Sequence, residues 1–65
     1  MRITLNGEPR EIVAETLGPA LDELGYGGAR VATAVNETFV PAPARAGHAL
    51  RDGDRIEVLA PRQGG

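Results

Sequence analysis

Residues 1–13, MRITLNGEPREIV, contain the pattern that decides the fold. Apolar and polar residues alternate over residues 1–5, and the pair Asn6-Gly7 follows directly. A type I′ turn needs positive φ at both central residues, which Asn-Gly supplies, so this pattern is a strong hairpin signal. We predict a first strand over residues 1–5 and a second at about residues 10–13. Pro9, where the turn meets the second strand, indicates that this strand lies at a sheet edge.

The next segment, residues 16–25 (TLGPALDELG), predicts a short amphipathic helix. Its apolar residues recur at the spacing i, i+3, i+4 and i+7, which places one stripe on a helix: Leu17, Ala20, Leu21 and Leu24. Thr16 is a suitable N-cap, Pro19 falls in the first turn, and Gly25 can adopt the left-handed conformation that ends a helix. Such a helix needs a sheet on which to pack.

The second half of the chain contains two further strand signals. Residues 31–36 (VATAVN) alternate, and we interpret them together with residues 38–40 (TFV) as a third strand. Two prolines and a glycine in residues 41–47 (PAPARAG) predict an irregular crossing segment. Residues 55–59 form the predicted last strand, with Ile56 and Val58 on one face. Asp52 and Asp54, beside a glycine, are expected to bond the backbone of a turn.

The order hairpin, helix, strand, crossing and strand indicates an α+β fold. One main helix packs on one face of a mixed sheet of four to five strands, and the simplest topology makes the first and last strands parallel neighbours in its middle. This arrangement is the β-grasp, or ubiquitin-like, fold. We expect residues 1–61 to form the domain and residues 62–65 a flexible tail. The predicted core is Ile3, Leu5, Ile12, Leu17, Leu21, Leu24, Val31, Val35, Leu50, Ile56 and Val58.

Composition narrows the classes of function. The 65 residues have a net charge of -2 and seven scattered arginines without lysine, which argues against nucleic-acid binding. The absence of cysteine excludes a thiolate nucleophile and a cysteine-bound zinc or iron-sulfur centre. No apolar run approaches a membrane span and residues 1–10 do not read as a signal peptide, so we expect no membrane association and a cytoplasmic location.

The sequence APRQGG at residues 60–65 places two glycines last. Glycine has no Cβ, so a Gly-Gly backbone can enter a narrow active site and present the carboxylate of Gly65. A carboxylate needs activation, most directly by attack on the α-phosphate of ATP to give an acyl-adenylate. We therefore expect Arg62, Gln63 and Gly64 to enter a partner's active site. The alternative interpretation is a frayed tail with no function.

Three segments together resemble the ThiS family of sulfur carriers in thiamine biosynthesis: AVNETFVP (34–41), LRDGDRIEVL (50–59) and the final QGG. The likeness covers essentially the whole chain, and the family has the β-grasp fold. The family often has an arginine directly after Val-Pro, whereas this chain has Ala42, Pro43 and Ala44. No partner contact is therefore assigned to residues 42–49.

The resemblance implies a protein cosubstrate rather than an enzyme, with no cofactor of its own. A ThiF-type adenylyltransferase would use ATP to adenylylate Gly65. A sulfurtransferase or cysteine desulfurase would supply sulfur, and the thiocarboxylate would donate it to thiazole synthase, ThiG. Carriers for molybdopterin or cysteine synthesis, ubiquitin-like modifiers and non-covalent β-grasp binding modules are the alternatives.

Leu59 and Phe39 are the candidate partner surface within the domain. Leu59 would point away from the helix if Ile56 and Val58 point toward it, and Phe39 lies just past the third strand. The two could form an apolar patch near the tail that docks partner enzymes. The alternative is that both side chains close the ends of the core.

Overall fold

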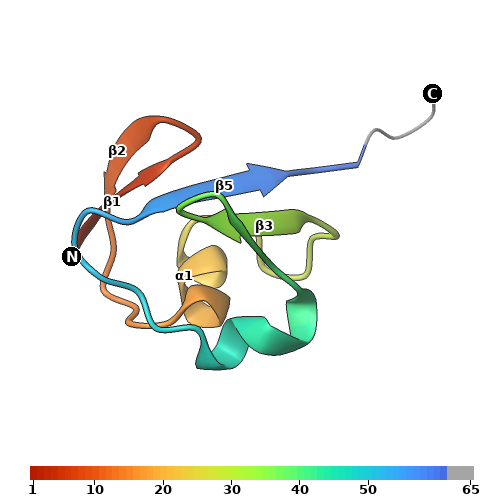
Figure 1. Ribbon diagram of the computed structural model, residues 1–65. Coiled ribbons are helices and arrows are strands. Elements are labelled where there is room, and N and C mark those ends of the chain that lie inside the picture. The colour runs from red at the N-terminus through yellow and green to blue at the C-terminus, as the bar shows by residue number, and fades with distance from the viewer. Residues whose placement is uncertain (62–65) are drawn as a thin grey trace.

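Five strands form one mixed sheet in the order β2-β1-β5-β3-β4 (Figure 1). The computed structural model describes residues 1–61. Along the chain its elements are β1 (Arg2–Leu5), β2 (Glu8–Glu11), α1 (Leu17–Glu23), β3 (Ala32–Val35), β4 (Thr38–Val40), the 3₁₀ helix η1 (Ala42–Gly47) and β5 (Arg55–Leu59). Strands β1 and β5 are parallel neighbours in the centre, and the other neighbouring pairs are antiparallel. This is the predicted β-grasp topology.

The first hairpin has the predicted turn, but its second strand begins and ends two residues earlier than predicted. Asn6 and Gly7 have φ of 50° and 87°, as a type I′ turn requires. Strand β2 begins at Glu8 rather than at residue 10, and Pro9 lies inside it opposite Thr4. The N-H of Ile12 and the amine of Met1 donate to each other's carbonyl oxygens, at 2.9 and 2.6 Å. Bonded and non-bonded pairs alternate along an antiparallel ladder, so Pro9 falls at a non-bonded pair that needs no N-H.

A second hairpin replaces the single strand predicted over residues 31–40. Strands β3 and β4 pair antiparallel across a tight turn at Asn36 and Glu37, whose φ values are 50° and 71°. This is the same left-handed pair of conformations as at Asn6-Gly7. The prediction was wrong because glutamate rarely adopts positive φ, so Asn36-Glu37 does not resemble a turn in the sequence.

Helix α1 begins and ends at the predicted signals. Thr16 holds the N-cap position with extended backbone, although its side chain makes no capping hydrogen bond. At the other end Gly25 has φ of 98°, the N-H of Gly25 donates to Asp22 O at 3.1 Å, and the N-H of Tyr26 donates to Leu21 O at 2.8 Å. These two bonds form a Schellman motif, which satisfies the last carbonyls of the helix.

The crossing segment is more regular than predicted. Residues 42–47 form the 3₁₀ helix η1, with Pro43 in its first turn, where proline is tolerated. Helix η1 packs against α1 at Gly18, where an added Cβ would lie 3.4 Å from Ala46 Cα. The two prolines in this segment therefore do not prevent a helix from forming.

The core fills the space between α1 and one face of the sheet. Figure 1 shows α1 on that side of the sheet, below β3 and β5. Nine of the predicted core residues are buried, whereas Leu24 and Val31 are only half-buried, and Ala20 and Val40 complete the cluster. Thr33 is the buried polar residue. Its hydroxyl donates to Val40 O at 2.8 Å and accepts from Arg45 Nε at 3.0 Å, so this buried hydroxyl is paired. Within residues 1–61, no helix is long and apolar enough to cross a membrane.

Candidate functional site

The described chain reaches Pro61, two residues beyond the end of β5. The four tail residues expected to enter a partner, Arg62, Gln63, Gly64 and Gly65, lie outside the described residues, as does the expectation of a flexible tail. The part of the candidate site that the structure places is therefore the end of β5 and the sheet face around it.

Strand β5 separates core from surface residue by residue. Ile56 and Val58 point toward α1 and are buried, as predicted, whereas Glu57 and Leu59 point to the opposite face. Leu59 is 73% exposed. We call the sheet face that carries Leu59, opposite α1, the outer face.

Phe39 lies on the same outer face and is 65% exposed. It pairs with Ala34 in the β3–β4 ladder, and Ala34 pairs with Glu57 of β5. Leu59 pairs with Ala32 on the same strand β3. Phe39 and Leu59 thus flank two alanines, and neither large side chain closes the core.

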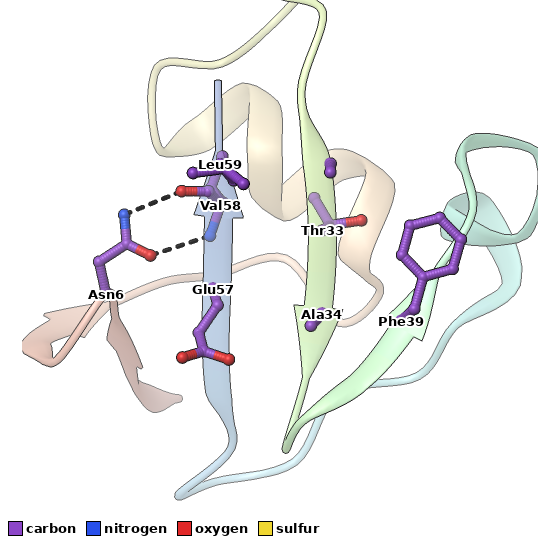
Figure 2. A pocket seen from close by; sticks show the side chains of 8 residues that line it. Asn6, Thr33, Ala34, Phe39, Glu57, Val58 and Leu59 are labelled. Carbon is purple, nitrogen blue, oxygen red and sulfur yellow. Dashed lines mark hydrogen bonds between the residues drawn. The ribbon is translucent and has the colours of Figure 1, made fainter. Parts of the chain in front are cut away.

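Small side chains between larger ones leave a shallow depression on the outer face, which we call the outer hollow (Figure 2). Its lining residues come from β3, β4, β5 and the first turn: Asn6, Ala32, Thr33, Ala34, Phe39, Glu57, Val58 and Leu59. The surface adjoining its Leu59 end continues past Ala60 and Pro61 toward the tail. The outer hollow is thus largely apolar and lies beside the strand from which residues 62–65 continue.

Asn6 holds β5 in place at the outer hollow. The β1–β5 ladder ends at the Leu5–Ile56 pair. Beyond it the Asn6 side chain accepts a hydrogen bond from the N-H of Val58 at 2.9 Å and donates Nδ2 to Val58 O at 3.2 Å (Figure 2). The amide thereby acts as one more peptide unit of β1. From the sequence we interpreted Asn6 only as a turn residue, and no local pattern indicated this bridge.

A matching asparagine fixes the other end of β5. Asn36 accepts from the N-H of Arg55 at 2.9 Å and donates to the Asp54 carboxylate at 2.9 Å. The Asp52 carboxylate accepts from the N-H of Arg2 at 2.8 Å. Asp54 also accepts from the N-H of Arg51 in its own turn, as predicted, whereas Asp52 bonds the backbone of β1 and not that of the turn. Within residues 1–61 no cluster of histidine, cysteine, aspartate and glutamate side chains could hold a metal ion.

Comparison with known proteins agrees with this geometry. The family model of the ThiS family matches residues 3–65. This chain belongs to the ThiS family. The resemblance noted from the sequence is therefore confirmed, and it extends over nearly the whole chain.

Three individual relatives each align with 92% or more of this ThiS-family chain. It is 41% identical over 63 residues to the sulfur carrier protein ThiS of Thermus thermophilus, which covers 97% of this chain and 98% of that protein. It is 38% identical over 61 residues to a thiazole synthase of Paramagnetospirillum magneticum, which covers 92% of this chain but only 19% of the synthase. The crystal structure of the thiamine biosynthesis protein ThiS from Geobacter metallireducens superposes with a TM-score of 0.82 over the full length of both chains, at 29% identity.

Proposed function

We propose that this protein is a sulfur carrier of thiamine biosynthesis whose Gly65 carboxylate is converted to a thiocarboxylate. The observation that carries the proposal is the full-length similarity to a sulfur carrier protein ThiS, together with the ThiS-family match through residue 65. The match includes both terminal glycines.

The chemistry proceeds in two steps on the chain's terminal carboxylate. A carboxylate oxygen of Gly65 attacks the α-phosphate of ATP, forming an acyl-adenylate and releasing pyrophosphate. A sulfur nucleophile then displaces AMP. Hydrosulfide gives the thiocarboxylate on Gly65 directly, whereas a donor persulfide gives an acyl disulfide, which a second thiol cleaves to release the thiocarboxylate and form a disulfide. In this proposal a ThiF-type adenylyltransferase binds the ATP, and a sulfurtransferase or cysteine desulfurase supplies the sulfur. The protein itself is the cosubstrate.

The fold supports this role by placing an apolar surface close to the terminus. Gly65 is the sixth residue after Leu59, and an extended chain of six residues spans at most about 20 Å. An enzyme that acts on Gly65 therefore lies within about 20 Å of Leu59. We propose that it docks on Leu59 and Phe39 across the outer hollow, while Arg62, Gln63 and Gly64 enter its active site.

The similarity to a thiazole synthase supports a partner for the later step. A segment similar to this chain makes up 19% of the Paramagnetospirillum magneticum thiazole synthase. A carrier-like segment and a synthase in one polypeptide are expected to work together, since joining them raises their effective concentration. We propose that the thiocarboxylate donates its sulfur to a ThiG-type thiazole synthase.

The experiment that tests this function is the exchange of labelled pyrophosphate into ATP by the adenylyltransferase, with this protein as the acceptor. The full chain should support exchange, and a variant that lacks Gly65 should not. Both should melt at the same temperature, because the buried core of the described chain is formed by residues within 3–58. Equal exchange with the truncated variant would contradict the proposal.

A further inference from the structure

Glu57 is the charged side chain of the outer hollow. It lies in the middle of β5 on the outward face, beside Ala34 of β3 in the ladder. Figure 2 shows its carboxylate beside the hollow, with Leu59 further along the same strand and Phe39 beyond β3. A surface that fills the outer hollow between Phe39 and Leu59 also meets Glu57, which lines it.

The neighbouring polar groups leave this carboxylate without a partner among residues 1–61. Arg55, two residues earlier on the same face of β5, pairs with Glu37 at 3.6 Å. The Asn6 amide, on the other side of β5, is bonded to the backbone of Val58. Glu57 is therefore exposed and hydrated in the free protein, and binding would remove that water.

The charge limits which surface can dock there. Covering a carboxylate with apolar surface alone is costly, whereas a cation at the same place forms a strong charge-assisted hydrogen bond. We infer that the partner surface that docks on the outer hollow presents an arginine or lysine side chain opposite Glu57, set among apolar side chains. Glu57 thereby selects among partners by charge. This inference rests on the proposed function, in which an enzyme acting on Gly65 uses this face.

The same charge disfavours a second copy of the chain as the occupant. A symmetric dimer packed through the outer hollow would place the same patch on both sides of the interface. It would bury two Glu57 carboxylates in one interface, and like charges in an interface oppose association. A partner with a complementary cation is the occupant that the charge favours.

The test compares the affinity of the ThiF-type adenylyltransferase for three proteins: the wild type, Glu57→Gln and Glu15→Gln. Glu15 is a matched control because it is an exposed glutamate in the segment before α1, away from the lining of the outer hollow. We expect Glu57→Gln to weaken binding by about tenfold or more, as loss of one member of a covered charge pair does. Glu15→Gln should bind as the wild type does, and both variants should keep its melting temperature.

The inference depends on whether Glu57→Gln binds the adenylyltransferase more weakly than the wild type does. If Glu57→Gln binds as tightly as the wild type, or more tightly, no cation faces Glu57 and the inference is wrong. Pyrophosphate exchange with the wild-type protein, measured in parallel, separates failure of the proposed function from failure of the charge inference. Exchange together with an unweakened Glu57→Gln variant overturns the charge inference alone. Failure of the wild type to bind or to support exchange overturns the proposed function, and the inference with it.

Discussion

At the scale of single residues, Asn6 has two structural roles that mutation can separate. Its backbone takes the left-handed conformation of the turn, and its side chain bonds both backbone groups of Val58. The Asn6→Gly variant keeps the left-handed turn conformation and removes both hydrogen bonds to Val58. We expect a loss of about 1–3 kcal/mol in the free energy of unfolding, from two hydrogen bonds of about 0.5–1.5 kcal/mol each.

Urea denaturation of Asn6→Gly measures this loss. Asn6→Asp is the companion variant, because its carboxylate can accept from the N-H of Val58 but would face Val58 O without a donor. It too should be less stable than the wild type. An unchanged unfolding midpoint for both would mean that the amide bridge contributes nothing to the stability of β5.

The same residues show what the sequence could reveal at this scale. Asn6-Gly7 predicted its turn because both residues tolerate positive φ. Asn36-Glu37 adopts the same conformations without a glycine, so the second turn was missed. The bridge from Asn6 to Val58 joins residues far apart in the sequence, and it depends on a strand register that no local pattern contains.

At the scale of elements, Glu23 fastens the end of α1 to the segment that follows β2. Its carboxylate accepts from the N-H groups of Ala14 at 3.0 Å and Val13 at 2.8 Å, which lowers the pKa of Glu23 below its ordinary value of 4.5. A lowered folded-state pKa gives stability that is present above 4.5 and lost as the pH falls through the folded value. Glu23→Gln should therefore unfold more easily than the wild type at neutral pH. The difference in unfolding free energy between the two proteins should become smaller in acid, where the carboxylate is protonated.

Unfolding curves of wild type and Glu23→Gln, taken at neutral pH and well below 4.5, check this pH dependence. An equal difference in unfolding free energy at the two pH values would show that the negative charge of the Glu23 carboxylate does not contribute to this contact.

The packing of α1 on the sheet supplies a second prediction at this scale. Leu21 is 5% exposed, and its truncation leaves a cavity between helix and sheet. Leu21→Ala should cost about 2–5 kcal/mol in unfolding free energy. Val13→Ala is the control, because Val13 is 86% exposed and its change should stay within about 0.5 kcal/mol. Similar losses for both variants in chemical denaturation would contradict the helix-on-sheet core.

Whether an element could be predicted depends on whether its sequence carries a local signal. Helix α1 and strand β5 carry complete local signals: a periodic apolar face with caps for α1, and alternation after an aspartate-glycine turn for β5. Helix η1 has no such signal. It forms because residues 42–47 pack against Gly18 of α1, a tertiary contact that the prolines alone do not indicate.

At the scale of the whole molecule, the sheet separates a core face from a face free to bind. Leu59 belongs to the second, so Leu59→Asp should leave the melting temperature almost unchanged and abolish or strongly reduce adenylylation. Thermal melts and pyrophosphate exchange on the same preparation measure the two effects. A large fall in melting temperature would assign Leu59 to the core, and normal exchange would remove it from the docking surface.

The candidate site was predictable in part at this scale. Alternation along residues 55–59 predicted that Leu59 points outward, and Phe39 was proposed as its neighbour. The hollow between them depends on Ala32 and Ala34 lying opposite Leu59 and Glu57, which only the β3–β5 register establishes. The proposed role of Gly65 comes from the tail sequence and the family, since residues 62–65 lie outside the described structure.

The central claim is that Gly65 carries sulfur, and an intact-mass measurement tests it most directly. The protein is incubated with ATP, its adenylyltransferase and a sulfide source, with an established sulfur carrier treated in parallel. The account predicts a mass change equal to one oxygen replaced by sulfur, which fragmentation locates at Gly65. An unchanged mass, while the parallel carrier is converted, would contradict the claim.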